Sequence, residues 1–181
     1  MSEQSVKDPV LIEWLKRTVL CQNSQYMAAR HYRLLHSVLG APLVVLSAFV
    51  ATSIVASYFS QIDPRIRLIT LFISIANVVL AALQTFLRFA ERAENHKLYG
   101  ARYGALRRKL EVALAHPPGD REKLADLLEK LRVQLDTLSN DAPDVPRTAW
   151  NSADKQFRRS FNKSSPITGQ ALYESNISDQ E

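Results

Sequence analysis

The sequence has little of what most enzymes and disulfide-stabilised proteins need. Its single cysteine, Cys21, excludes an internal disulfide. Its five glycines form no GxGxxG, GxxxxGK[ST] or GxSxG pattern, so no nucleotide-binding loop or nucleophile elbow is visible. Its four histidines show no HExxH spacing, which leaves no sign of a catalytic metal. We therefore expect no enzymatic activity, no metal site and no cofactor.

Charge is missing from two long stretches of the chain. Residues 37–62 and 68–87 contain no Asp, Glu, Lys or Arg. As helices they would be about 39 Å and about 30 Å long, and the hydrocarbon core of a bilayer is about 30 Å thick. Buried helices of a soluble protein are the alternative, but such helices rarely lack a charged face over this length. The sequence therefore predicts two transmembrane helices.

Only residues 63–67 separate the two spans, which predicts a hairpin with Pro64 in the turn. Basic side chains flank the pair unevenly, with three in residues 17–36, five in residues 88–107 and two in the loop. The positive-inside rule then places both termini on the cytoplasmic side. The net charge of +5 fits this topology, so we do not expect nucleic-acid binding.

Apolar residues recur at helical spacing outside the two spans. Asp8 and Pro9 are typical of a helix start, and Asp120 can cap a later helix. Three helical seams follow: Leu11, Trp14, Thr18, Cys21, Gln25, Ala28, Tyr32 and Leu35; Phe89, Ala93, His96, Tyr99, Tyr103, Leu106, Leu110 and Ala113; and Leu124, Leu128, Leu131, Leu135 and Leu138. We expect the membrane helices to continue outside the bilayer and to pack with a third helix. The seams could pack within one chain or join subunits.

The expected fold is an all-α membrane protein, a two-transmembrane helical hairpin whose helices extend into a cytosolic helical bundle. Its segments are an amphipathic helix (1–36), the first span (37–62), an external loop (63–67), the second span (68–87), cytosolic helices (88–139) and a polar C-terminal tail (140–181). The tail should be mostly extended, with room for a short helix from Trp150 to Lys163. That helix could dock on the bundle, touch anionic lipid headgroups or stay disordered, and we favour docking.

A polar line marks one face of the second span. Its members are Thr70, Ser74, Asn77, Ala81 and Gln84, at steps of four and three, and the line continues through Arg88, Glu91, Asn95 and Arg102. Polar side chains in hydrocarbon need a partner or water, so this stripe either forms a helix interface or lines a pore made by several copies. Small residues of the first span should allow close helix approach: Ala41, Ser47, Ala48, Ala51 and Ala56.

Trp14, Arg17 and the stretch from Tyr26 to Tyr32, followed by the two spans and FAERAENHKLYGARYGALRRKLE, resemble the SLATT family. These are bacterial two-transmembrane effector domains associated with SMODS nucleotidyltransferases and SLOG sensors. The resemblance covers residues 10–139. It implies a homo-oligomeric, pore-forming effector of the inner membrane that acts in antiphage or conflict systems downstream of a nucleotide signal.

The resemblance also implies partners: the lipid bilayer, further copies of the chain, and a nucleotide second messenger or the nucleotidyltransferase or sensor that supplies it. Arg102, Arg107 and Arg108 are basic residues that could meet such an anionic signal, although they equally suit the membrane-proximal charge bias. A function of another class stays open. The chain could be a non-conducting membrane-anchored scaffold or signalling adaptor whose cytosolic bundle binds a soluble partner.

Overall fold

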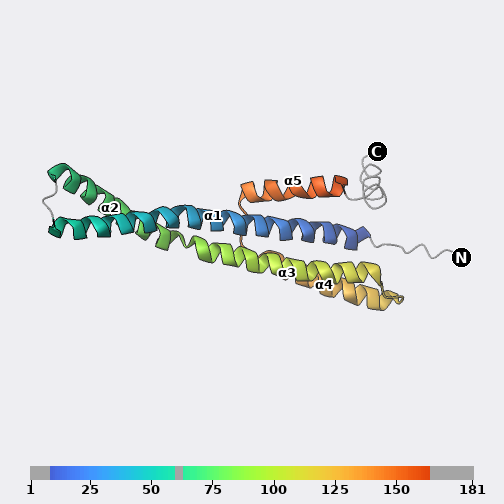
Figure 1. Cartoon of the computed structure of the whole chain (residues 1–181). Coiled ribbons are helices and arrows are strands. Elements are labelled where there is room, and N and C mark those ends of the chain that lie inside the picture. Colours follow the sequence, from blue (N-terminus) through green and yellow to red (C-terminus); the bar gives the residue numbers. More distant parts are fainter. Residues whose placement is uncertain (1–8, 60–62, 164–181) are drawn as a thin grey trace. The chain divides into compact units, whose positions relative to one another are not determined.

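The computed structural model describes residues 9–59 and 63–163, and the side chains of residues 9–56 and 63–160 (Figure 1). Its elements are α1 (Pro9–Phe59), α2 (Pro64–Leu87), α3 (Phe89–Ala115), α4 (Arg121–Asp141) and α5 (Arg147–Lys163). No strand occurs in the described part of the chain, so the all-helical prediction is confirmed there. The chain divides into two compact units. We name residues 29–94 the hairpin unit and the described residues on either side of it the bundle unit.

Two helix starts follow from capping residues. Asp63 accepts a hydrogen bond from the backbone amide of Arg65 at 2.8 Å, and Pro64 is the first residue of α2. Asp120 likewise accepts from the amide of Glu122 at 3.1 Å and caps α4 as predicted. The expected loop at residues 63–67 is therefore wrong in extent. Pro64 opens a helix there, because its missing N–H would have no partner in the first turn anyway.

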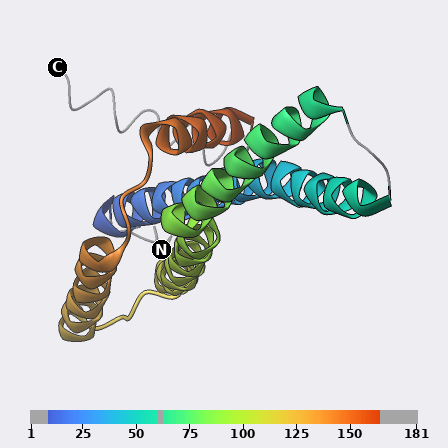
Figure 2. The same ribbon diagram turned by 90° about the vertical axis from the view of Figure 1, so that its left-hand side faces the viewer.

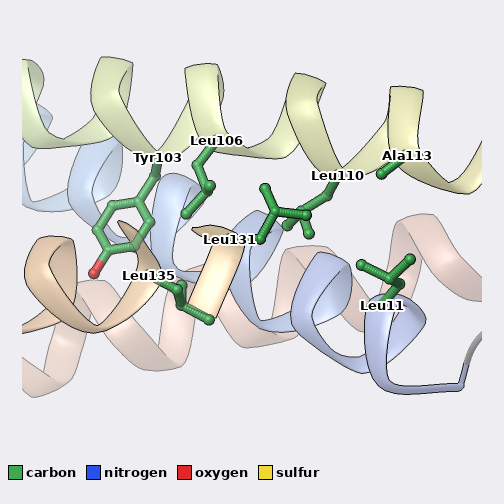
Figure 3. Close-up of a cluster of buried hydrophobic side chains, with 7 residues drawn as sticks. All are labelled: Leu11, Tyr103, Leu106, Leu110, Ala113, Leu131 and Leu135. Carbon is green, nitrogen blue, oxygen red and sulfur yellow. The ribbon is translucent and has the colours of Figure 1, made fainter. Parts of the chain in front are cut away.

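The core of the bundle unit is built from the predicted seams. Leu11 of α1, Leu110 of α3 and Leu131 of α4 are each at most 3% exposed. Figure 3 shows these side chains pointing toward one another with Tyr103, Leu106, Ala113 and Leu135. Burial of each leucine contributes roughly 1.5–3 kcal/mol. Within the described residues, the seams therefore pack inside one chain.

The helix expected inside the polar tail is present and docked. Ala149 and Ala153 of α5 are 5% and 0% exposed, and Figures 1 and 2 both draw α5 alongside the first part of α1. Trp150 stays 39% exposed, so small alanines rather than the aromatic ring form the buried part of this face. Of the three alternatives for this segment, docking is the one that the structure shows for residues 147–160.

The hairpin unit contains the second part of α1 and all of α2. Both helices are long and apolar enough to cross a membrane, and none of their most apolar stretches is buried. α1 stays helical across Pro42. Large apolar side chains point outward, among them Val44, Phe72, Val78 and Phe86. This unit therefore has no apolar core comparable to that of the bundle unit.

Candidate functional site

The polar stripe of α2 lies on the less exposed face of that helix. Thr70, Ser74, Asn77, Ala81 and Gln84 are all half-buried, whereas Phe72 and Phe86 on other faces are 64% and 80% exposed. The Asn77 amide Nδ2 donates a hydrogen bond to Ser47 Oγ of α1 at 2.8 Å. The stripe therefore contacts α1 at Asn77 within the hairpin unit.

The hydroxyl groups near this contact are satisfied locally. Ser47 donates to the carbonyl of Leu43 at 2.8 Å, and Ser74 donates to that of Thr70 at 2.8 Å. The carbonyl oxygen Oδ1 of Asn77 is different, because it is buried and has no hydrogen-bond partner among the described residues. In hydrocarbon such an acceptor is costly. A single hairpin thus satisfies the stripe incompletely.

Gly40 makes room for the last member of the stripe. A Cβ atom at this position would lie 3.0 Å from Nε2 of Gln84, which is closer than ordinary van der Waals contact. The absence of a side chain therefore lets the Gln84 amide rest against α1. Together with the bond between Asn77 and Ser47, this contact fixes how α2 faces α1.

Most small residues of the first span are exposed in the hairpin unit. Ala41, Ala48, Ala51 and Ala56 are exposed, and only Ser47 of the predicted set contacts the polar stripe. The half-buried residues of α1 in this region are mainly larger: Leu39, Leu43, Leu46 and Val50. The side chains of the four alanines therefore stay available for a neighbour outside the described chain, and close helix approach through them stays a prediction.

The helix break at Arg88 was not predicted. Arg88 has φ 48° and ψ 40°, and it is the one described residue other than glycine with a positive φ. This left-handed conformation ends α2, and the Arg92 amide donates to the Arg88 carbonyl at 3.1 Å as α3 begins. An ion pair joins Arg88 to Glu91. The polar line therefore does not continue on one helix into Asn95 and Arg102, which corrects the expectation of an unbroken helix.

The structure does not gather Arg102, Arg107 and Arg108 into one site. On α3 they point in directions separated by about 100° to 140°. The Arg102 guanidinium lies 4.9 Å from the centre of the Tyr99 ring, and Arg107 pairs with Glu111 at 2.7 Å. Arg102 alone of the three lines a groove of about 350 Å³ between α3 and α4.

Lys109 shares that groove with Arg102, and sequence reasoning missed it. Its ammonium donates to Gln134 of α4 at 2.9 Å. The spacing of seven residues, about two helical turns, places both cations on one face of α3 and could have revealed the pair. Among the predicted basic residues, Arg102 therefore keeps the best geometry for meeting an anionic partner.

A buried polar cluster holds the bundle unit together. The Gln25 amide Nε2 donates to the carbonyl of Pro143 at 3.1 Å, which leaves Gln25 Oε1 to accept from Nδ1 of His96 at 2.6 Å. Both side chains are at most 4% exposed. Burial lowers the pKa of His96, so the neutral ring is favoured. The cluster joins α1, α3 and the connection between α4 and α5.

No group of three His, Cys, Asp or Glu side chains that could hold a metal occurs within residues 9–59 and 63–163. Among the features described above are a helix interface with an unsatisfied polar atom at Asn77 and a groove lined by two cations and by Asp141. Comparison with known proteins does not narrow this choice: no protein-family model matches the chain, and no curated protein or solved structure matches it either.

Proposed function

We propose that the chain is an oligomeric effector of the bacterial inner membrane that permeabilises the membrane when its bundle unit receives a signal. In this proposal the hairpin unit crosses the bilayer, and the bundle unit and both termini lie in the cytoplasm. The observation that carries it is the outward exposure of Phe72, Val78 and Phe86, at 64%, 68% and 80%. Soluble monomers rarely expose apolar surface on this scale, so lipid or further copies should cover it.

Conduction requires several copies, because one hairpin encloses no lumen. The polar stripe is the best candidate to line one. In the described conformation Asn77 is bonded to Ser47, and the proposal takes this arrangement as the closed state. The unpartnered Oδ1 of Asn77 favours a second arrangement in which water or another copy supplies a donor. Opening then requires α2 to turn its stripe away from α1.

The signal would reach the membrane through α1, which is one helix from Pro9 to Phe59 and contributes to both units. The resemblance over residues 10–139 supports an antiphage or conflict role and a nucleotide signal made or sensed by a partner. In the bundle unit, the groove with Arg102 and Lys109 is where an anionic signal would find two cations.

A second candidate function is a non-conducting membrane-anchored scaffold. It is favoured by the hydrogen bond between Asn77 and Ser47, which uses the polar stripe inside the hairpin itself. Interhelical hydrogen bonds of this kind contribute on the order of 1 kcal/mol in membranes. In this case the bundle unit would bind a soluble partner, and the stripe would only hold the two spans together.

Ion flux through vesicles separates the two candidates. The purified full chain is reconstituted at increasing protein density into sealed vesicles of bacterial polar lipids, with and without cyclic dinucleotides as probes. The effector proposal predicts ion leakage that rises with density and falls several-fold in the double variant Asn77→Leu with Gln84→Leu. Thr85→Leu, which removes a polar group from the exposed face of α2, is the matched control and should leak like the wild type.

Insertion is checked in parallel by resistance of each variant to alkaline extraction. Vesicles that stay sealed under every condition would favour the scaffold. If the double variant leaked as much as the wild type, the protein would still conduct. The polar stripe would then not line the lumen.

A further inference from the structure

The bundle unit contains a cleft that belongs neither to the polar stripe nor to the groove between α3 and α4. Its volume is about 300 Å³. Its walls come from α1, α3, the end of α4, the connection between α4 and α5, and the first turn of α5. The side chains that matter for its chemistry are Arg17, Cys21, Tyr103, Ser139, Asp144 and Trp150.

Hydrogen-bonding groups line one part of the cleft. Tyr103 is 3% exposed, and its hydroxyl is hydrogen-bonded to Ser139 and to Cys21. Burial raises the pKa of the Tyr103 hydroxyl and of the Cys21 thiol, so both groups stay protonated near neutral pH. Buried Gln25 also borders the cleft and is fixed by its bonds to Pro143 and His96. This part of the cleft is therefore preorganised.

The ring of Trp150 borders the cleft and is partly exposed. Trp150 is 39% exposed although α5 docks through Ala149 and Ala153, which are almost fully buried. A docked helix normally buries its largest apolar side chain, because indole has the most apolar area to remove from water. The Trp150 ring instead borders the cleft, where a planar ligand could stack on it.

Two opposite charges complete the lining. Arg17 extends from α1 and Asp144 from the connection after α4, and in the described part of the chain no ion pair joins them. A guanidinium binds phosphate or carboxylate oxygens with two parallel hydrogen bonds. A carboxylate accepts from ring amino groups. The lining thus presents separate positions for an anion, for hydrogen-bond donors and for a flat ring.

We propose that this cleft binds a small molecule made of a planar heteroaromatic ring and an anionic group, with the anion on Arg17 and the ring on Trp150. The volume lies at the lower end of the range of ligand pockets, so the ligand is no larger than a mononucleotide. The inference goes beyond the proposed pore and does not depend on it, because a scaffold that never conducts would bind the same ligand.

Occupancy of the cleft would act on the packing of the bundle unit. A ligand held by Arg17 and Trp150 bridges α1 and α5, next to the bond by which Gln25 holds the carbonyl of Pro143. Binding would therefore favour the docked position of α5, since a ligand stabilises the conformation that it contacts.

Fluorescence of Trp150 tests the proposal directly. The chain has two tryptophans, and Trp14→Phe leaves Trp150 as the only one. In this background the purified full chain in lipid nanodiscs is titrated with AMP and with nicotinate, each of which combines a heteroaromatic ring with an anionic group. Adenosine and inorganic phosphate, the two parts of AMP, are titrated separately. We expect saturable quenching by AMP or nicotinate and at least tenfold weaker binding of the halves. Arg17→Ala should weaken binding at least tenfold, whereas Arg121→Ala, an exposed arginine outside the cleft, should not.

Cys21 provides a second readout, because it is the single cysteine of the chain and borders the cleft. A bound ligand should slow labelling of Cys21 by a maleimide at least fivefold at pH 8, and Arg17→Ala should abolish this protection. The proposal is overturned if AMP and nicotinate at millimolar concentration change neither signal. It is also overturned if Arg17→Ala and the wild type respond alike.

Discussion

The hairpin and bundle units are both helical, and they expose opposite kinds of side chain. In the bundle unit Leu110 is 1% exposed, and ion pairs such as those of Arg132 with Glu129 and Asp136 lie on the surface. In the hairpin unit Phe86 is 80% exposed, and the polar contact between Asn77 and Ser47 lies between the helices. The comparison teaches that the same helical periodicity buries apolar side chains in one unit and brings polar side chains between the helices in the other.

The largest change in stability is expected from removing a buried leucine from the core of the bundle unit. Leu110→Ala should destabilise the bundle unit by about 3–4 kcal/mol, because a core leucine loses its burial and leaves a cavity. Val112→Ala, on the same helix but 64% exposed, should change stability by less than about 0.5 kcal/mol. Thermal unfolding of the purified full chain measures both. Equal shifts in the two variants would show that α3 is not packed as described.

A matched pair of valines tests whether the two units meet different solvents. Val78 of α2 and Val112 of α3 are 68% and 64% exposed, so neither is needed to fill a core. Val78→Arg should disfavour membrane insertion by about 3 kcal/mol, because a guanidinium is placed in hydrocarbon. Val112→Arg should insert normally, since its side chain meets water. Alkaline extraction of membranes reports both, and equal behaviour of the two arginine variants would erase the proposed difference in solvent.

At Arg88, between α2 and α3, a glycine variant should be more stable than an alanine variant, which is the reverse of the usual order in a helix. Both Arg88→Gly and Arg88→Ala lose the ion pair with Glu91, so their difference isolates the backbone. Glycine should be more stable by about 1 kcal/mol, because it adopts a positive φ without strain. At Arg92, which lies inside α3, alanine should be more stable than glycine by about 1 kcal/mol. Thermal midpoints that follow the same order at both positions would contradict the break.

The smallest effect near neutral pH concerns His96. Its pKa is lowered by burial in the folded state, so the unfolded chain binds more protons as the pH falls below about 6.5. The free energy of unfolding should therefore decrease on acidification through this range and level off below the folded-state pKa. In His96→Asn this contribution to the pH dependence should disappear from thermal unfolding profiles. If His96→Asn kept the wild-type slope of unfolding free energy against pH, His96 would not be the cause of that slope.

The helices and their buried faces could be predicted because apolar residues recur regularly along the chain. Leu11, Leu110 and Leu131 come from separate seams and meet in one core. The less exposed face of α2 could likewise be predicted, because a polar line on an otherwise apolar helix needs partners or water.

Three features could not be predicted, each for a physical reason. Arg88 gives no sign of a left-handed residue, because such positions are usually marked by glycine or asparagine. Pro64 is common both in turns and at the first position of helices, and only the cap by Asp63 distinguishes them. The cleft beside Trp150 depends on how α5 docks, which periodicity within one helix does not specify.

The central claim is that lipid covers the exposed apolar side chains of the hairpin unit. Fractionation of cells expressing the full chain, followed by treatment of the membranes at alkaline pH, tests it most directly. We predict that the protein stays in the pellet after both steps and enters solution only with detergent. Recovery of folded protein in the high-speed supernatant without detergent would contradict the claim, and the proposed effector and scaffold would fail together.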